Sequence, residues 1–311
     1  MDIFVQQLIN GLVLGSLYAL VALGYTMVYG ILGLINFAHG EVLMVGAMVS
    51  WSVVSMAQDA GWDLPGWVLL GGSMLVAMAV CALLNVAIER LVYRPLRNAP
   101  RLAPLITAMG VSMALQTLAM ILWKPSPKPY PQLLSDETLS LWVDGPVITP
   151  TQILILGVTL LLLAGLSWLV HRTRLGRAMR ATAENPQVAA LMGVRPNQII
   201  AITFGLGALL AAVAGVMWAA NYGMVQHSMG FLPGLKAFTA AVLGGIGNLT
   251  GAMVGGVLLG LIEALGAGYL GQWTGGLLGS NYVDIFAFSV LILVLTLRPS
   301  GLMGERSADR A

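Results

Sequence analysis

Charged residues are scarce in this chain of 311 residues. Only 9% of the residues are Asp, Glu, Lys or Arg and 58% are hydrophobic, whereas a soluble domain carries about a quarter charged residues. This shortage of charge excludes an ordinary soluble domain. Uncharged runs such as 67–88, 102–123 and 151–170 reach the ~20 residues that a helix needs to cross a bilayer. The sequence therefore predicts an integral membrane protein.

The sequence also has little of what catalytic and cofactor sites need. It has a single cysteine, Cys81, which excludes a disulfide framework and a cysteine-based metal site. His171 and His227 have no partners at metal-ligand spacing, and the residues suggest no Ser/His, His-rich or paired-carboxylate arrangement. We therefore expect no metal site, no cofactor and no enzymatic activity.

A nucleotide-binding loop is missing as well. The chain contains no Gly-x-x-x-x-Gly-Lys-[Ser/Thr] motif, and none of its three lysines lies in a glycine-rich phosphate loop. The chain itself is therefore not expected to hydrolyse ATP. The net charge of +2 gives no reason to expect a nucleic-acid partner, because topology distributes the basic residues of a membrane protein.

The apolar runs that are present predict the fold class. In lipid the backbone must satisfy its own hydrogen bonds, so the spans must be helical. We expect an all-α polytopic membrane protein, one transmembrane domain over residues 1–311, with about eight transmembrane helices and a range of roughly seven to nine. The predicted spans are approximately 4–28, 41–56, 67–88, 102–123, 151–170 and 198–220, with two or three more after Leu235. The glycine-rich region 237–283 leaves open one full span, two spans, or a re-entrant hairpin with a span.

Three groups of arginines predict the topology. Loops rich in Lys and Arg face the cytoplasm, so we expect a cytoplasmic C-terminus and cytoplasmic loops after the third and fifth spans. The arginines are Arg90, Arg94, Arg97 and Arg101, then Arg172, Arg174, Arg177 and Arg180, and finally Arg298, Arg306 and Arg310. The proline-rich segment 124–150, with Asp136, Glu137 and Asp144, is expected outside. Asp2, without a nearby Lys or Arg, favours an outside N-terminus, but the open number of spans leaves its side open.

Three polar residues, Asn36, His39 and Glu41, interrupt an apolar and small-residue region. One interpretation is an ordinary turn at the membrane surface, where polar residues cost little. The other is a polar hinge beside a translocation route, since ionisable groups inside a membrane are rare and mark substrate pathways. For Glu263, which follows a long apolar run, a helix-packing hydrogen bond is favoured over a coupling-ion site.

A later segment repeats part of this region. The pattern Leu-Gly-x-Ile-x4-Gly occurs at 32–40 and again at 243–251. Chance similarity between two glycine-rich and leucine-rich segments is one explanation. The other is a chain of two loosely repeated halves, whose broken or re-entrant helices line the pathway between them. Under the second explanation the predicted hinge and pathway residues are Asn36, His39, Gly40, Glu41, Gly244, Gly245, Asn248 and Gly251.

One long segment of mixed polarity, 172–197, lies between two predicted spans. Residues 179–184 favour a short helix, Asn185-Pro186 breaks it, and residues 187–192 favour a second short helix that Gly193 ends. The second helix carries an apolar face formed by Val188, Ala189, Leu191 and Met192.

This apolar face needs a cover, because it would otherwise remain in water. A cytoplasmic partner is favoured as that cover, and the alternative is a pair of helices lying in the lipid headgroup layer. The residues predicted to dock the partner are Arg174, Gly176, Arg177, Arg180, Glu184, Asn185, Pro186, Ala189 and Gly193.

A resemblance to a known family rests on three stretches, GLINFAHGEVLMVGA, RTRLGRAMRATAENPQVAALMGV and GGIGNLTGAMVGGVLLGLIE. In this order they resemble the LivH-type permease subunits of branched-chain amino acid ABC importers, and the likeness covers almost the whole chain. The stretch QVAALMG at 187–193 is similar to the E-A-A-x-x-x-G motif with which importer permeases engage an ATPase. It departs from that motif at Gln187 and Val188, and the later I-x-L-P part is missing.

The resemblance implies an inner-membrane importer subunit that translocates Leu, Ile or Val by alternating access. It implies as partners a second homologous permease of the LivM type, two cytoplasmic ATPase subunits and a periplasmic substrate-binding protein. Because the sequence offers no obvious charged anchor for the substrate, high selectivity is expected of the binding protein. One alternative is a related permease for urea, amides or other small solutes. Another is an ion-coupled secondary transporter or channel that uses Glu41 or Glu263.

Overall fold

Helices dominate the structure, a computed structural model that describes residues 2–97, 99–100, 102–135, 137–140, 142, 145–275, 282–298 and 300–304. Within these residues, seven helices are long and apolar enough to cross a membrane. This confirms the predicted all-α polytopic fold. Five residues used for the predicted topology lie outside the described residues: Arg101, Asp136, Asp144, Arg306 and Arg310.

The helices agree closely with the predicted spans. The long helices are α1 (Asp2–Leu32), α2 (His39–Asp59), α3 (Gly66–Ile88), α4 (Leu102–Trp123), α5 (Pro150–Arg172), α8 (Pro196–Tyr222) and α10 (Leu249–Trp273). The shorter ones are α6 (Arg174–Glu184), α7 (Pro186–Leu191), α9 (Phe231–Gly244) and α11 (Val283–Leu297), and α3 continues into a π-helical turn, η1 (Glu89–Tyr93). Each of the first six predicted spans falls inside its helix, because the apolar run sets the centre of a span and local turn residues set its ends.

The region that left three possibilities open contains a short helix, a break and a long helix. The short helix α9 has 14 residues, too few to cross a bilayer, whereas α10 has 25. Between them Gly245 has a φ of 106° and Gly247 a φ of 98°, a backbone conformation that favours glycine. Among the described residues this region therefore contains one helix long enough to span a membrane, α10, preceded by the end of the short helix α9.

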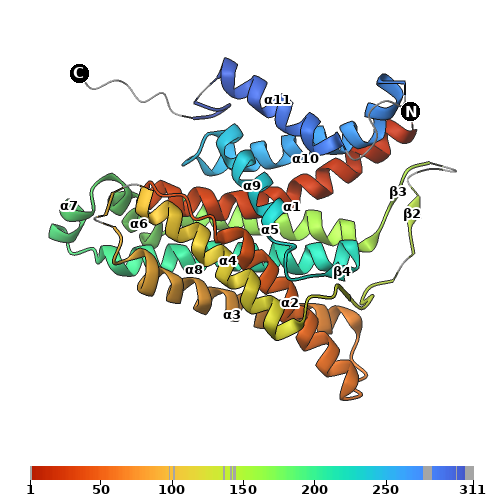
Figure 1. The fold of residues 1–311 in the computed structure, drawn as a ribbon, viewed down its shortest axis with the longest axis horizontal. Coiled ribbons are helices and arrows are strands. Elements are labelled where there is room, and N and C mark those ends of the chain that lie inside the picture. The colour runs from red at the N-terminus through yellow and green to blue at the C-terminus, as the bar shows by residue number, and fades with distance from the viewer. Residues whose placement is uncertain are drawn as a thin grey trace.

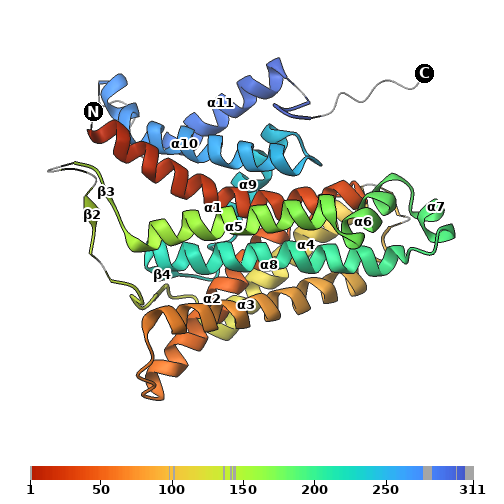
Figure 2. The same cartoon turned by 180° about the vertical axis from the view of Figure 1, so that it is seen from behind.

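The helices α1 and α8 form the centre of the bundle. In the most apolar stretch of each helix, the buried share of the residues is 89% for α1 and 78% for α8, but only 22% for α4 and 17% for α5. The helices α4 and α5 therefore present apolar side chains outwards, where lipid would cover them. Figure 2 shows α1 between α10 and α5, with α8 beyond α5.

Glycines bring α1 and α10 together at backbone distance. A Cβ atom on Gly15 would lie 2.7 Å from the Cα atom of Val257, and one on Gly256 would lie 2.6 Å from the Cα atom of Ala19. Small residues allow this close approach, which supplies van der Waals contact where lipid removes the hydrophobic effect between helices. The tight pair fixes the α1 surface that carries the site described below.

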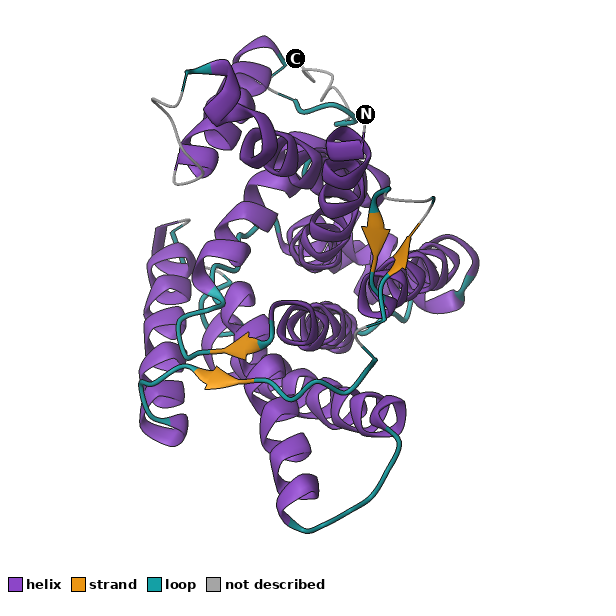
Figure 3. Cartoon of the chain, turned by 90° about the vertical axis from the view of Figure 1, so that its right-hand side faces the viewer, coloured by secondary structure: helices purple, strands orange, loops and turns teal. Residues whose placement is uncertain are grey.

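The two ends of the bundle differ. At one end, two short antiparallel pairs join β1 (Lys128–Pro129) to β4 (Met224–Val225) and β2 (Leu139–Ser140) to β3 (Val147–Ile148), as Figure 3 shows. We call this the strand end. The helices α6 and α7 lie at the opposite end, and α1 begins at the strand end (Figure 1).

Candidate functional site

The break between α1 and α2 buries the polar residues that the sequence singled out. α1 ends at Leu32, Gly33 adopts a φ of 62°, and α2 begins at His39. The exposed fraction is 2% for Asn36, 0% for His39 and 1% for Glu41. A turn at the surface would leave such side chains in contact with solvent or headgroups. The burial of all three side chains therefore argues against an exposed turn at the surface.

Side chains from α4 and η1 hold this break by hydrogen bonds. The Tyr93 hydroxyl donates to Asn36 Oδ1 at 2.7 Å. On α4, the Ser112 hydroxyl and the Gln116 amide donate to Glu41 Oε1 at 3.1 Å and 2.6 Å. Sequence reasoning missed Tyr93, Ser112 and Gln116, because they are polar residues spaced within ordinary apolar helices and nothing local marks them.

Several polar atoms at the break keep hydrogen-bonding capacity. Both ring nitrogens of His39, Asn36 Nδ2 and Glu41 Oε2 have no partner among the residues that the structure describes. The His39 ring packs edge-on against Tyr25, with 4.8 Å between ring centroids. It occupies the space that a side chain on Gly24 would need. Leaving buried polar groups without partners costs free energy.

Gly40 lets α2 cross the start of α9. A Cβ atom on Gly40 would lie 2.7 Å from the carbonyl oxygen of Gly230 and 2.9 Å from the Cα atom of Gly234. The two backbones therefore touch directly at this point. A contact between two backbones can slide with little side-chain rearrangement, which suits a pivot.

The second predicted break is also a break between helices, but it has other neighbours. Asn248 caps α10 by accepting from the Gly251 amide at 3.0 Å, and it donates to the Met303 carbonyl oxygen at 2.9 Å. The backbones of Gly244 and Gly251 approach closely. On α1, Gly30 faces Gly247. The structure thus assembles Gly244, Gly245, Asn248 and Gly251 into one break and Asn36, His39, Gly40 and Glu41 into another.

The segment 172–197 forms two short helices, as its sequence predicts. Asn185 caps α7 by accepting from the amides of Gln187 and Val188 at 2.9 Å and 3.1 Å, Pro186 is its first residue, and Gly193 follows it with a φ of 84°. The first helix, α6, begins at Arg174 rather than at the predicted 179. Thr173 explains the difference, because its hydroxyl caps α6 by accepting from the Gly176 amide at 3.1 Å.

Most of the predicted docking residues are exposed at the end of the bundle. Exposed residues of this set are Arg174, Arg177, Arg180, Glu184, Asn185, Pro186 and Gly193. Gly176 and Ala189 are buried, so they hold the helices to the bundle and leave the outward surface to the others. Of the apolar face, Val188 is 54%, Leu191 87% and Met192 81% exposed. These three side chains are the ones that need a cover.

Glu263 makes the helix-packing hydrogen bond that its sequence context favours. The Tyr18 hydroxyl on α1 donates to Glu263 Oε2 at 2.9 Å. The same carboxylate also pairs with Lys236 of α9, which sequence reasoning missed because the two positions are 27 residues apart. Among the described residues, no group of three or more His, Cys, Asp or Glu is placed to hold a metal ion.

Comparison with known proteins decides the family. Residues 7–295 match the model of the family described as branched-chain amino acid transport system / permease component. The chain belongs to this permease family. It is 45% identical over 309 residues to BraD of Pseudomonas aeruginosa, a high-affinity branched-chain amino acid transport system permease protein, with 99% of this chain and 98% of BraD covered.

A second relative agrees with this assignment. The permease is 42% identical over 313 residues to LivH of Escherichia coli K12, also a high-affinity branched-chain amino acid transport system permease protein, with 99% of this chain and 97% of LivH covered. LsrC of Escherichia coli K12 / DH10B, an autoinducer 2 import system permease protein, is 37% identical over 128 residues, or 38% of this chain and 37% of LsrC. No solved structure matches the chain.

Proposed function

We propose that this chain is the membrane-spanning permease subunit of an ABC importer that moves branched-chain amino acids, Leu, Ile and Val, across the inner membrane. The observation that carries the proposal is the near full-length similarity to BraD and LivH. The similarity to LsrC covers little more than a third of this chain and gives less support to a different cargo. The alternative cargoes, such as urea and amides, gain no support from the relatives described above.

The proposed assembly contains this chain, a second homologous permease of the LivM type, two cytoplasmic ATPase subunits and a periplasmic substrate-binding protein. The absence of a nucleotide-binding loop in the sequence supports separate ATPases. The exposed apolar and basic side chains of α6 and α7 support their docking there. In this orientation the α6–α7 end is cytoplasmic, together with the C-terminus, and the strand end faces the periplasm with the N-terminus.

The proposed mechanism is alternating access driven through α6 and α7. Closure of the ATPases would move these helices, and the movement would reach the two breaks at 33–38 and 245–248. Interrupted helices whose freed backbone groups face a cavity are a common device for such transport. Gly40 and Gly245 are the proposed pivots, since one lies at a direct backbone crossing and the other has a φ of 106°.

Charge reversal tests the docking. The double variant Arg177→Glu/Arg180→Glu should abolish co-purification of the ATPases while membrane insertion stays normal, because two exposed cations become anions beside the apolar face. The matched control reverses Lys124 and Lys128 at the opposite end. Unchanged co-purification of the Arg177/Arg180 variant would refute the docking surface.

Uptake by the reconstituted importer tests the cargo and the energy source. Vesicles that hold the complete importer and internal ATP should accumulate radiolabelled leucine when binding protein is added. Uptake that survives ATP depletion but collapses without an ion gradient would overturn the proposal in favour of ion coupling.

A further inference from the structure

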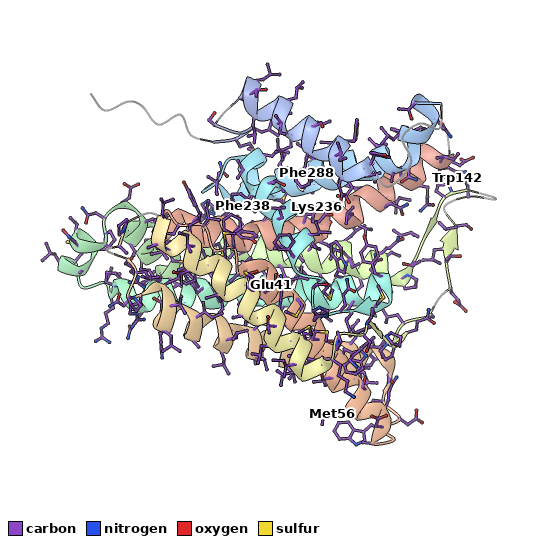
Figure 4. All side chains as sticks on the ribbon, viewed as in Figure 1. Glu41, Met56, Trp142, Lys236, Phe238 and Phe288 are labelled. Carbon is purple, nitrogen blue, oxygen red and sulfur yellow. The ribbon has the colours of Figure 1, made fainter. Side chains whose placement is uncertain are left out.

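A cluster of charged side chains joins four helices of the bundle. Lys236 Nζ on α9 lies 2.6 Å from Glu263 Oε1 on α10 and 2.7 Å from Asp284 Oδ1 at the start of α11. The Tyr18 hydroxyl on α1 holds the other oxygen of Glu263. Four helices thus contribute one side chain each. In Figure 4 Lys236 lies within the helical body, whereas Trp142 lies at the strand end.

This cluster costs more than packing alone would require. The side chain of Lys236 is 10% exposed and that of Glu263 14%. Removing such charges from water carries a desolvation penalty that pairing only partly repays. Small and apolar residues already join α1, α9 and α10 in this bundle. A largely buried charged cluster within an otherwise apolar helix bundle is therefore an argument for a functional role.

Two cavities meet at the cluster. One of about 300 Å³ is bounded by Tyr18, Trp218 and Tyr222 together with Lys236 and Glu263. A second, of about 420 Å³, is lined by Asn10, Asn221 and Asp284 among others, and it shares Leu14, Tyr222 and Glu263 with the first. Sites for one small ligand begin at ~300 Å³.

The charges at the cluster do not balance. The two carboxylates and one ammonium sum to one negative charge, and two of the three N–H donors of Lys236 are directed at these carboxylates. The side chain of Asp284 is 46% exposed, so its carboxylate remains accessible. A ligand that brings one cationic group and one anionic group, close together, fits this arrangement.

We propose that the two cavities bind the zwitterionic head and the aliphatic side chain of an amino acid on its way through the permease. Its ammonium group binds Asp284 and Glu263, and its carboxylate takes the remaining donor of Lys236. Its side chain lies against Leu14 and Trp218. The inference rests on the proposed function and adds to it a charged substrate anchor, which the sequence did not reveal.

Cysteine protection tests the site in the permease–ATPase complex without binding protein. Ser228 lines the smaller cavity and is exposed, whereas the native Cys81 is fully buried. A Ser228→Cys variant should react with a small polar thiol reagent, and L-leucine should slow that reaction. Two analogues complete the series. 4-Methylpentanoate, which lacks the ammonium group, and 3-methylbutylamine, which lacks the carboxylate, should each protect far less than leucine.

Substitutions of the anchors extend the test. In the Ser228→Cys background, Asp284→Asn should raise the leucine concentration needed for protection about ten- to a hundredfold, because a hydrogen bond to a charged group is lost. Leucine should still protect the cysteine when Lys236 is replaced by Arg, but not when it is replaced by Met. Asp63→Asn, an exposed acid in the loop after α2, is the matched control. Folding is checked by Cys81, which should stay unreactive in each variant.

The outcomes separate this inference from the proposed function. If the complete importer accumulates leucine but leucine does not slow labelling of Ser228→Cys, the site is refuted and the function stands. If equimolar sodium chloride protects as well as leucine does, the cluster is an inorganic cation site and the inference is wrong. If leucine protects the cysteine but is not accumulated, the site stands and the proposed function fails.

Discussion

A buried carboxylate connects the loop after α3 to the segment 172–197, and removing one of its partners gives a sharp test of this connection. Glu89 has an exposed fraction of 0%. It accepts from Arg94 Nη2 at 3.0 Å and from Arg97. Arg97 also donates to Asn197 Oδ1 at 2.6 Å, at the end of that segment. Burial lowers the pKa of the Arg97 guanidinium, and the nearby Glu89 carboxylate offsets only part of this lowering.

The substitution Arg97→Met should destabilise the permease strongly. Breaking a buried ion pair by removing one partner costs about 3–5 kcal/mol, because the other charge stays buried. Arg94 remains as a partner, but its side chain is 37% exposed and neutralises Glu89 less well. We therefore expect about 3 kcal/mol, the lower end of that range. Arg90→Met, a change at an exposed neighbour, should have little effect.

A double-mutant cycle shows whether the loss comes from the uncompensated charge. Glu89→Gln in the Arg97→Met background removes that charge, and it should recover about 1–2 kcal/mol. The assay is the unfolding free energy in mixed micelles, followed by circular dichroism as denaturing detergent is added. If the double variant is as unstable as the sum of the single variants, Glu89 and Arg97 are not coupled and the reasoning fails.

Two further predictions follow from backbone geometry. The substitution Gly256→Val places a side chain against Ala19 and should cost about 1–3 kcal/mol by forcing α1 and α10 apart. The loss should appear as a lower melting temperature in detergent. Gly71→Ala, which has open space around it, should leave the melting temperature almost unchanged. The substitution Asn185→Ala removes the cap of α7 and should lower the stability of this helix by about 1 kcal/mol. The measurement is amide hydrogen exchange at Gln187, which should become faster. Exchange as slow as in the wild type would contradict the role of the cap.

The amino-acid sequence by itself determined the spans, the short helices and the family. An uncharged run of about 20 residues has no stable place but the bilayer, which is why the predicted span 102–123 coincides with α4. Capping is equally local, because Asn185 and Gly193 act on amides and carbonyls within a few residues. The start of α6 at Arg174, five residues before the predicted 179, is equally local, because the Thr173 hydroxyl caps it.

The burial of the breaks and the partners of the buried polar groups depend on how distant helices pack. Hydropathy does not distinguish the 14-residue helix α9 from part of a longer span, since both are apolar. Glu41 is buried because α4 supplies Ser112 and Gln116, more than seventy positions away. Lys236 meets Glu263 and Asp284 only because α9, α10 and α11 pack side by side. Such contacts depend on how helices cross, and helix crossing is set by the whole bundle rather than by any local pattern.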